Sequence, residues 1–328
     1  MINRELIRIK VVQLVYAYEQ NGSTNIDKAE KELIFSLSKA YHLYNYLLQL
    51  IVAITKEARR HVEIGEARAR REGKTPPSPK FANNRFVLQL EENHTLNDFI
   101  ETQKMTWDDD IEFVRKLYSR IEACEAYRDY MASDDDSYEA DRELWRKLYK
   151  LLIMDNDDFD SLLEEKSLYW NDDKEVVDTF VLKTIRRFDS AQGADMELLP
   201  EFKDKEDRDF AVKLFRTAIL NGTEYQGYMG VMSQNWDFSR LAFMDMIIMQ
   251  VAIAEMLSFP GIPINVTINE YVELSKVYST SKSASYINGM LDSIARQLAA
   301  EGKLFKPLPE VKRKGNHTDM PTEDNLQS

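Results

Sequence analysis

The segment from Pro263 to Ala295 constrains the fold more than any other part of the chain. Two apolar periodic stretches flank one polar loop, 279–283, which is rich in serine. Thr267 followed by Glu270 has the spacing of a capping box and predicts a helix that starts at Thr267 and runs to about Tyr278. Apolar residues then recur at helical spacing and predict a second helix: Tyr286, Ile287, Met290, Leu291, Ile294 and Leu298.

Upstream, residues 236–257 read as one helix that is apolar almost all round, which indicates a central, buried element. Its polar interruptions, Asp245, Gln250 and Glu255, argue against a membrane span. Gly289 falls inside the last predicted helix, where glycine costs about 0.5–1 kcal/mol relative to alanine. Its presence suggests that another backbone approaches it closely.

Three segments, in this order, resemble the C-terminal half of the NusB family of transcription antitermination factors: WDFSRLAFMDMIIMQVAIAEML, IPINVTINEYVELSKVYS and KSASYINGMLD. The opening RELIRIKVVQLVYAYEQ is similar to that family's first helix, including Gln13 and Tyr16. The resemblance covers residues 1–20 and 206–298. It implies an all-α fold, a NusB-like helical bundle core with a large helical insertion at 21–205. Residues 299–328 are expected to be a disordered tail.

Composition agrees with long helices, because the 328 residues include only 11 Gly and 9 Pro. Cys124 is the single cysteine, which excludes an intrachain disulfide, and the four histidines lack metal-ligand spacing. We therefore expect neither a metal nor a cofactor. No apolar run reaches the length of a signal peptide core or a membrane span, so we expect a soluble, cytoplasmic protein without membrane association.

The insertion also shows helical periodicity, with breaks at Pro76–Lys80 and at three acidic clusters. Its predicted helices occupy 28–71, 111–131, 138–153, 158–168 and 174–188. The acidic clusters (134–136, 155–160 and 171–173) are typical of residues that cap helices and complement their dipoles. A calcium loop is excluded at 155–166, because its sixth and twelfth positions are Asp160 and Lys166. The alternative is a role in repelling nonspecific RNA or engaging a basic protein.

Nothing in the sequence supports catalysis. Ser279 and Lys282 have the spacing of a Ser-x-x-Lys nucleophile motif, but the companion motifs are missing. No phosphate-binding or dinucleotide-binding glycine motif occurs. NusB-like domains are also found fused to RNA methyltransferases, yet no glycine-rich, strand-alternating segment is present to hold a methyl donor. We predict that the protein is not an enzyme.

The net charge of −13 and pI of 5.0 argue against generic nucleic-acid binding, so any RNA site has to be local. At the start of the first helix, Arg4 and Arg8 are spaced i, i+4, and Lys10 and Gln13 are spaced i, i+3. Cations there oppose the helix dipole, which suggests a purpose beyond helix stability. The alternative is that the two arginines only solvate the helix edge. The resemblance favours RNA contact, since the family begins this helix with RNA-binding arginines.

The polar loop and the helix after it form the second predicted part of the RNA site. By resemblance its residues are Lys276, Tyr278, Lys282, Ser283, Tyr286 and Asn288. Lysines and hydroxyls suit phosphate oxygens. Tyr16 and Gln13 could offer stacking and base-edge contacts to single-stranded RNA. Packing is the better-supported role for Tyr16 and Tyr286, because both lie among apolar residues.

The resemblance implies a factor that recognises boxA-type single-stranded RNA in ribosomal RNA transcripts together with NusE, the ribosomal small-subunit protein. It would act within the RNA polymerase antitermination complex. Two alternatives remain: a helical protein-interaction scaffold, or an RNA-binding accessory of an rRNA-modifying enzyme. A homodimer formed through apolar helix faces is also possible.

Overall fold

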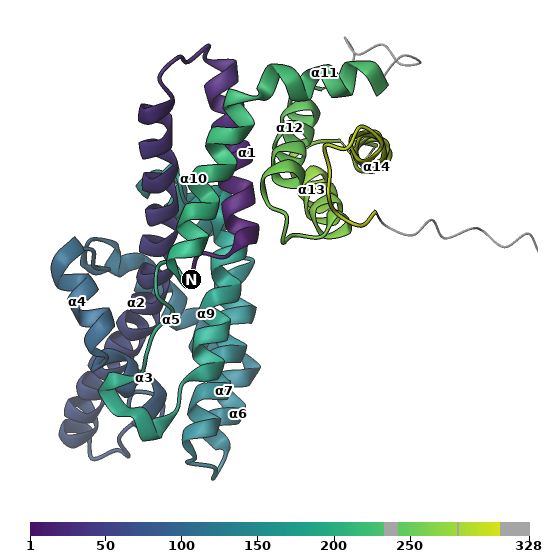
Figure 1. Cartoon of the computed structure of the whole chain (residues 1–328). Coiled ribbons are helices and arrows are strands. Elements are labelled where there is room, and N and C mark those ends of the chain that lie inside the picture. Colours follow the sequence, from purple (N-terminus) through teal and green to yellow (C-terminus); the bar gives the residue numbers. More distant parts are fainter. Residues whose placement is uncertain (233–241, 281, 309–328) are drawn as a thin grey trace, which may run out of the picture. The chain divides into compact units, whose positions relative to one another are not determined.

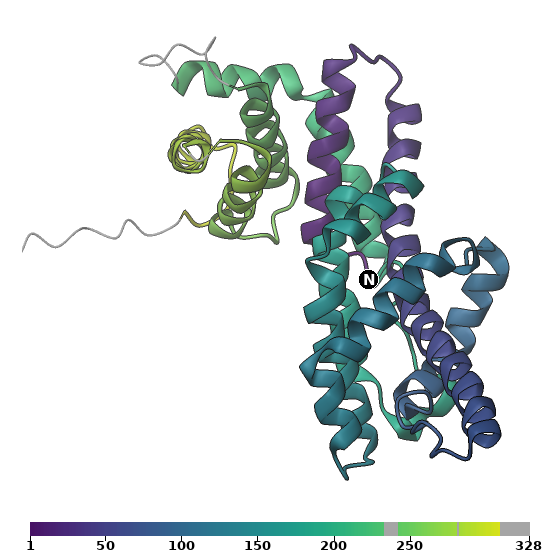
Figure 2. The same ribbon diagram turned by 180° about the vertical axis from the view of Figure 1, so that it is seen from behind.

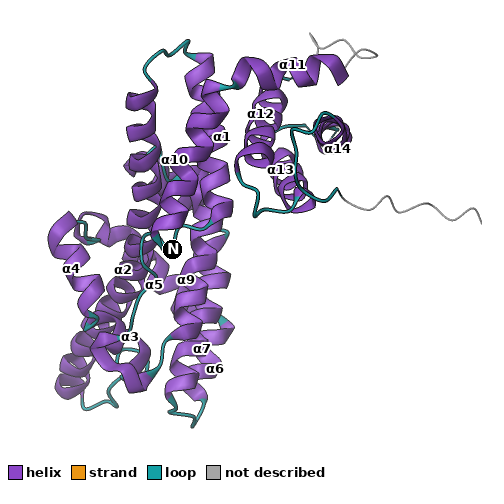
Figure 3. Ribbon diagram, viewed as in Figure 1, coloured by secondary structure: helices purple, strands orange, loops and turns teal. Residues whose placement is uncertain are grey.

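The computed structural model describes residues 1–232, 242–280 and 282–308, whose regular structure is helical (Figures 1 and 3). The predicted all-α class is confirmed. β pairing within these residues is confined to one isolated bridge between Ile2 and Phe202. None of the described helices combines the length and apolar character needed to cross a membrane. The chain divides after Arg216 into two compact units, unit 1 (1–216) and unit 2 (217–328).

Unit 1 is organised around a helical hairpin of α1 (Arg4–Gln20) and α2 (Ile26–Glu72), which run side by side in both views (Figures 1 and 2). At 1.5 Å per residue, α2 is about 70 Å long. Asn25 caps its start by accepting a hydrogen bond from the backbone N–H of Lys28, and Gly73 ends it with a left-handed φ of 64°. The predicted amphipathic helix 28–71 is therefore confirmed.

Of the other helices of unit 1, α3, α4, α5 and α9 pack against α2, and α7 packs against α3, α6 and α9. In chain order they are α3 (Arg85–Glu91), α4 (His94–Gln103), α5 (Ile111–Ala123), α6 (Glu125–Ala132), α7 (Tyr138–Tyr149), α8 (Asp157–Lys166), α9 (Lys174–Arg187) and the unit 1 part of α10 (Lys205–Leu220). Short helical turns lie at Asp108–Asp110, Lys150–Met154, Asn171–Asp173 and Ser190–Asp195. The single helix predicted at 111–131 is wrong, because Cys124 has an extended backbone (ψ 151°) that separates α5 from α6.

Aromatic side chains fill the core of unit 1. The rings of Tyr46 and Trp107 stack with centroids 4.1 Å apart, and the Trp107 indole donates to the Tyr46 carbonyl at 3.0 Å. Trp145 is fully buried against Phe81, at a centroid distance of 5.6 Å. Such rings bury large apolar areas, so they stabilise the packing of the insertion helices on α2.

Unit 2 is built around α12 (Phe243–Ser258), which contacts α11 (Gly222–Met232), α13 (Ile264–Tyr278) and α14 (Ser283–Ala300). The prediction of a central, buried helix is confirmed, although α12 begins at Phe243 and residues 236–241 of the prediction lie outside the described residues. Glu255 is fully buried in α12 and accepts hydrogen bonds from Thr267 (2.9 Å) and Tyr271 (3.0 Å). These bonds join α12 to α13.

The predicted capping box at Thr267 is wrong. The helix begins three residues earlier, and its cap residue is Pro263, whose φ of −61° suits the entry to a helix. Thr267 is fully buried, and its hydroxyl is directed to Glu255 instead of its own helix start. The tertiary hydrogen bond thus replaces the local one that the sequence pattern indicates.

The prediction that the acidic clusters cap helix starts is confirmed in part. Three aspartates of the 155–160 cluster lie in the first turn of α8, and Asn156 caps that helix by accepting from the N–H of Phe159. Near 134–136, Asp135 accepts from the N–H of Ser137, which itself caps α7. The cluster at 171–173 differs, since Asp173 makes no cap hydrogen bond at the start of α9.

The predicted domain boundaries remain a prediction. In the structure, α1 packs in unit 1 together with the helices of the predicted insertion. Past α14, Leu304 and Lys306 are buried in the stretch expected to begin the tail. Residues 309–328 lie outside the described residues.

Candidate nucleic-acid interface

Arg4 is the exposed cation at the start of α1. Asn3 caps this helix, accepting from the N–H of Leu6 at 2.9 Å, and the Arg4 side chain is 44% exposed. Its Nε lies 3.5 Å from the Asp207 carboxylate, and its guanidinium is 5.1 Å from the centre of the Phe210 ring. The ion pair is long and its Arg4 side is open to solvent, which weakens it, whereas the Asp207 side chain is only 12% exposed.

Arg8 and Lys10 are buried, in contrast to the surface position that helical spacing predicts for RNA-binding cations. Arg8 is 5% exposed and lies over the Phe210 ring at 5.8 Å. Lys10 is 3% exposed, and its ammonium group lies 2.7 Å from the Asp173 carboxylate. In this packing, neither cation is accessible to an RNA in solution.

The residues that cover Lys10 belong to the turn between α8 and α9, Tyr169–Asp173, which we call the acidic turn. The Tyr169 carbonyl accepts from Lys10 Nζ at 3.5 Å, and Asp172 accepts from Gln13 Nε2 at 2.8 Å. Burial raises the pKa of Asp173 to about 6, although nearby Lys10 acts in the opposite direction. The acidic turn therefore holds a buried carboxylate against the face of α1 that the sequence assigns to RNA.

Gln13 and Tyr16, the other residues predicted on α1, are both half-buried, and both interact with neighbours in the structure. Tyr16 is thus consistent with the packing role that the sequence favours.

In unit 2, the described residues of the polar loop between α13 and α14 are linked through Ser283. This residue is 4% exposed and donates to Asp245 Oδ2 of α12 at 2.8 Å. Its oxygen also lies 3.0 Å from the Ser279 hydroxyl and 2.8 Å from the Thr280 hydroxyl. Ser283 hence fixes the loop and positions the first turn of α14. Asp245 was not predicted as part of this region, although a carboxylate in an otherwise apolar helix was the available signal.

Exposed polar groups flank this network. Lys282 and Asn288 are exposed, and Lys276 is 53% exposed with its ammonium group 2.6 Å from Glu273. Tyr278 and Tyr286 are half-buried, and burial, then the charge of Asp245, raises the pKa of Tyr286. Of the residues predicted in this half, Lys276, Lys282 and Asn288 are the accessible ones. We call the exposed surface of 276–288 the elbow surface.

Gly289 borders the elbow surface and has no backbone from another part of the described residues close to it. It is exposed, and a Cβ atom built there would meet no atom within 4 Å. The predicted close approach by another part of the chain is therefore wrong.

Alanine at position 289 is expected to raise the free energy of unfolding by about 0.5–1 kcal/mol, because the helix loses the entropic penalty of glycine without a steric one. Urea denaturation of Gly289→Ala measures this. Gly65→Ala in α2 is the matched control, since its Cβ would lie 2.7 Å from Pro77 Cγ and should cancel the gain. A destabilised Gly289→Ala would show that the position is sterically closed.

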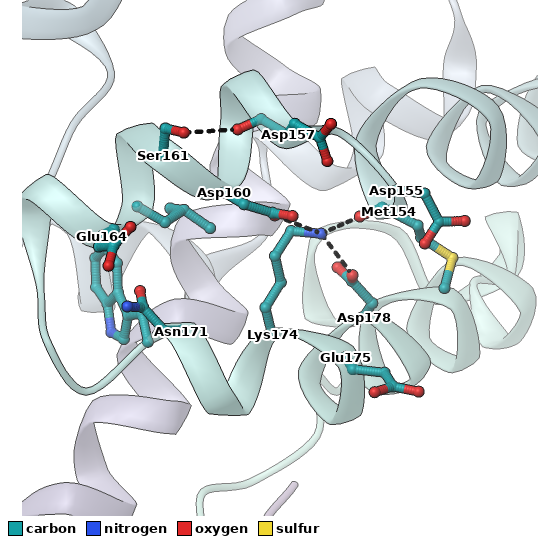
Figure 4. A pocket seen from close by; sticks show the side chains of 12 residues that line it. Met154, Asp155, Asp157, Asp160, Ser161, Glu164, Asn171, Lys174, Glu175 and Asp178 are labelled. Atoms are coloured by element: carbon teal, nitrogen blue, oxygen red, sulfur yellow. Dashed lines mark hydrogen bonds and ion pairs between the residues drawn. The ribbon is translucent and has the colours of Figure 1, made fainter. Parts of the chain in front are cut away.

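A separate pocket of about 580 Å³ lies in unit 1 beside α8 and α9 (Figure 4). Lys174 at its wall is 2.9 Å from Asp178 and 3.5 Å from Asp160. The other acidic side chains that line it are Asp155, Asp157, Glu164 and Glu175. Its charge repels phosphates, so it is no RNA site. No group of three or more His, Cys, Asp or Glu side chains in the described parts of the chain is arranged to hold a metal ion.

Comparison with known proteins identifies the family. A profile described as the NusB family matches residues 180–296. The transcription antitermination protein NusB of Salinibacter ruber is 31% identical over 132 residues, which are 38% of this chain and 82% of that protein. That of Koribacter versatilis is 37% identical over 116 residues, 35% of this chain and 80% of that protein.

Other matches are shorter. The NusB of Chloroherpeton thalassium is 35% identical over 33% of this chain, and the chain spans 53% of that relative's length. A solved structure of T. maritima NusB is 31% identical in sequence. The match covers 38% of this chain and 87% of the T. maritima chain, with a TM-score of 0.29. On the sequence relationships, which span most of two family members, this chain belongs to the NusB family.

Proposed function

We propose that the protein is a non-enzymatic, RNA-binding transcription antitermination factor. The observation that carries the proposal is its relationship to two proteins named transcription antitermination protein NusB, each matched over about four fifths of its length. The exposed cations at the start of α1 and on the elbow surface supply the local positive charge that RNA binding requires.

Local charge supports this surface despite the acidic chain. Residues 276–288 contain two lysines and no acidic residue, within a chain of net charge −13. Lys282 and Asn288 are exposed there and offer a charge and an amide to RNA. Arg4 offers a second cation on unit 1. With few cations, binding depends on stacking and base-edge contacts as well as on phosphates.

The RNA in this proposal is a boxA-type single strand of ribosomal RNA transcripts. The protein partner is NusE, the ribosomal small-subunit protein, within the RNA polymerase antitermination complex. A partner is required by the charge argument, because the buried Arg8 and Lys10 leave few cations of α1 available. We therefore expect tighter RNA binding in the presence of NusE than in its absence.

Fluorescence anisotropy with labelled boxA-type RNA tests the proposal, with and without NusE and at several salt concentrations. Arg4→Ala or Lys282→Ala should each weaken binding about fivefold to tenfold, equivalent to about 1–1.4 kcal/mol. Each should also reduce the salt slope by about 0.7, the value for one phosphate contact of a single strand.

Lys147→Ala is the matched control, since Lys147 is an exposed lysine of α7 that belongs to neither predicted half of the RNA site. Its affinity should equal that of the wild type. Equal binding of a scrambled RNA, or indifference to Arg4→Ala and Lys282→Ala, would contradict specific recognition. If the chain binds another protein specifically but does not bind RNA, the alternative function of a helical protein-interaction scaffold is favoured.

A further inference from the structure

We propose that the acidic turn (Tyr169–Asp173) is an internal competitor of RNA, which occupies the face of α1 that carries Lys10 and Gln13. This inference rests on the proposed RNA-binding function and adds its regulation. Two contacts carry it: Asp173 lies 2.7 Å from the Lys10 ammonium group, and Asp172 accepts from the Gln13 amide at 2.8 Å. The turn belongs to the insertion, so the insertion acts on the site.

The acidic turn presents to α1 the chemistry that RNA would present. The Asp173 carboxylate contacts Lys10 as a phosphate oxygen of RNA would. The Asp172 carboxylate accepts from Gln13 as an acceptor on a base edge would. The two side chains of the Lys10–Asp173 pair are only 4% and 0% exposed. RNA therefore reaches Lys10 only when the acidic turn moves away.

The contact with α1 is poorly satisfied compared with the contact of the same turn with α2. Apart from the ion pair with Lys10, neither oxygen of Asp173 has a hydrogen-bond partner among the described residues. A buried ion pair recovers little of the hydration that its two charges lose, so the pair as a whole adds little to stability, although removal of one partner alone is costly. By contrast, Trp170 anchors the turn to α2, since its indole donates to the Lys39 carbonyl at 2.9 Å and its ring stacks with Tyr46 at 5.4 Å. The turn is thus held by α2, and its hold on α1 is exchangeable.

Loosening the competitor should strengthen RNA binding. Asp172→Ala removes both the charge and the acceptor that meets Gln13, at an exposed position, so the fold should tolerate it. We expect the affinity for labelled boxA-type RNA to rise about threefold to tenfold in the full-length chain. Asp134→Ala is the matched control, because it removes an exposed charge from another acidic cluster of unit 1. The control should leave the affinity unchanged, and equal gains in both variants would overturn the inference in favour of general charge repulsion.

Locking the acidic turn should abolish the gain and weaken binding further. The variant carries Cys124→Ser, Gln13→Cys and Asp172→Cys and is crosslinked with a short bifunctional maleimide. We expect at least tenfold weaker RNA binding than in the same variant treated with N-ethylmaleimide. Circular dichroism of both forms confirms that each is folded.

The outcomes separate this inference from the proposed function. Specific RNA binding that is equal in locked and unlocked forms would overturn the competitor while leaving the function intact. Absence of specific RNA binding in every form, with NusE present, would overturn the function and the competitor together.

Discussion

Asp173→Ala is expected to lower the free energy of unfolding of unit 1 by about 3–5 kcal/mol. Asp173 is fully buried, and its carboxylate is the anion beside the Lys10 ammonium group. Removal of the carboxylate leaves a positive charge in a site from which water is excluded. Urea denaturation followed by tryptophan fluorescence measures the effect, since Trp107, Trp145 and Trp170 all lie in unit 1.

The double variant Lys10→Met, Asp173→Leu is the control for this prediction. Replacement of both partners by apolar residues removes the uncompensated charge and should recover most of the lost stability. Asp172→Ala, at the exposed neighbour, should change stability by less than about 0.5 kcal/mol. A loss below about 1 kcal/mol for Asp173→Ala would mean that water reaches Lys10.

Glu255→Ala is expected to destabilise unit 2 by about 2–5 kcal/mol. Glu255 is fully buried, and its two oxygens accept from the hydroxyls of Thr267 and Tyr271. Each hydroxyl that loses its acceptor in the core costs about 1–3 kcal/mol. Because these bonds join α12 to α13, thermal unfolding of the full chain by far-UV circular dichroism should show an earlier transition for unit 2.

Tyr271→Phe is the matched control for Glu255→Ala. It removes one of the two hydroxyls and leaves Glu255 with Thr267, so a loss of about 0.5–1.5 kcal/mol is expected. If the two variants are equally stable, the carboxylate does not hold α13 in the way described.

Elements with long, regular apolar periodicity could be predicted from the sequence, since local periodicity and packing agree in them. The long helix α2 and the last helix α14 are examples, and the stripe Ile287, Leu291, Ile294 is buried as predicted. The break at Cys124 was missed because the apolar pattern continues across it. The short helices α3 and α4 were also missed, because 7 and 10 residues give too few turns for a clear period.

The candidate site was less predictable, because its surroundings come from distant parts of the chain. Helical spacing places Lys10 and Gln13 correctly on α1, yet their partners in the acidic turn are distant in sequence. Gln13 and Asp172, for example, differ by 159 in residue number. No local pattern indicates that pairing. Thr267 shows the same effect. Local spacing predicts that its hydroxyl caps a helix, but in the structure the hydroxyl donates to the Glu255 carboxylate on α12.

The elbow surface was predicted better, because its polar residues are consecutive and belong to one loop and one helix start. Lys282 and Asn288 are exposed as an RNA contact requires, whereas Ser283 serves the loop itself through Asp245. The sequence identified the residues of this region, and the structure separates those that face solvent from those that hold the loop.

The central claim is that the exposed cations at the start of α1 and those on the elbow surface each contact boxA-type RNA. Photo-crosslinking of a boxA-type RNA that carries a single 4-thiouridine, followed by mass spectrometry of the full-length protein with NusE, tests it most directly. Moving the 4-thiouridine along the strand should give crosslinks near Arg4 from some positions and within 276–288 from others, all competed by unlabelled boxA-type RNA but not by a scrambled strand. Crosslinks confined to one of the two regions at every position, or located elsewhere in the chain, would contradict the account.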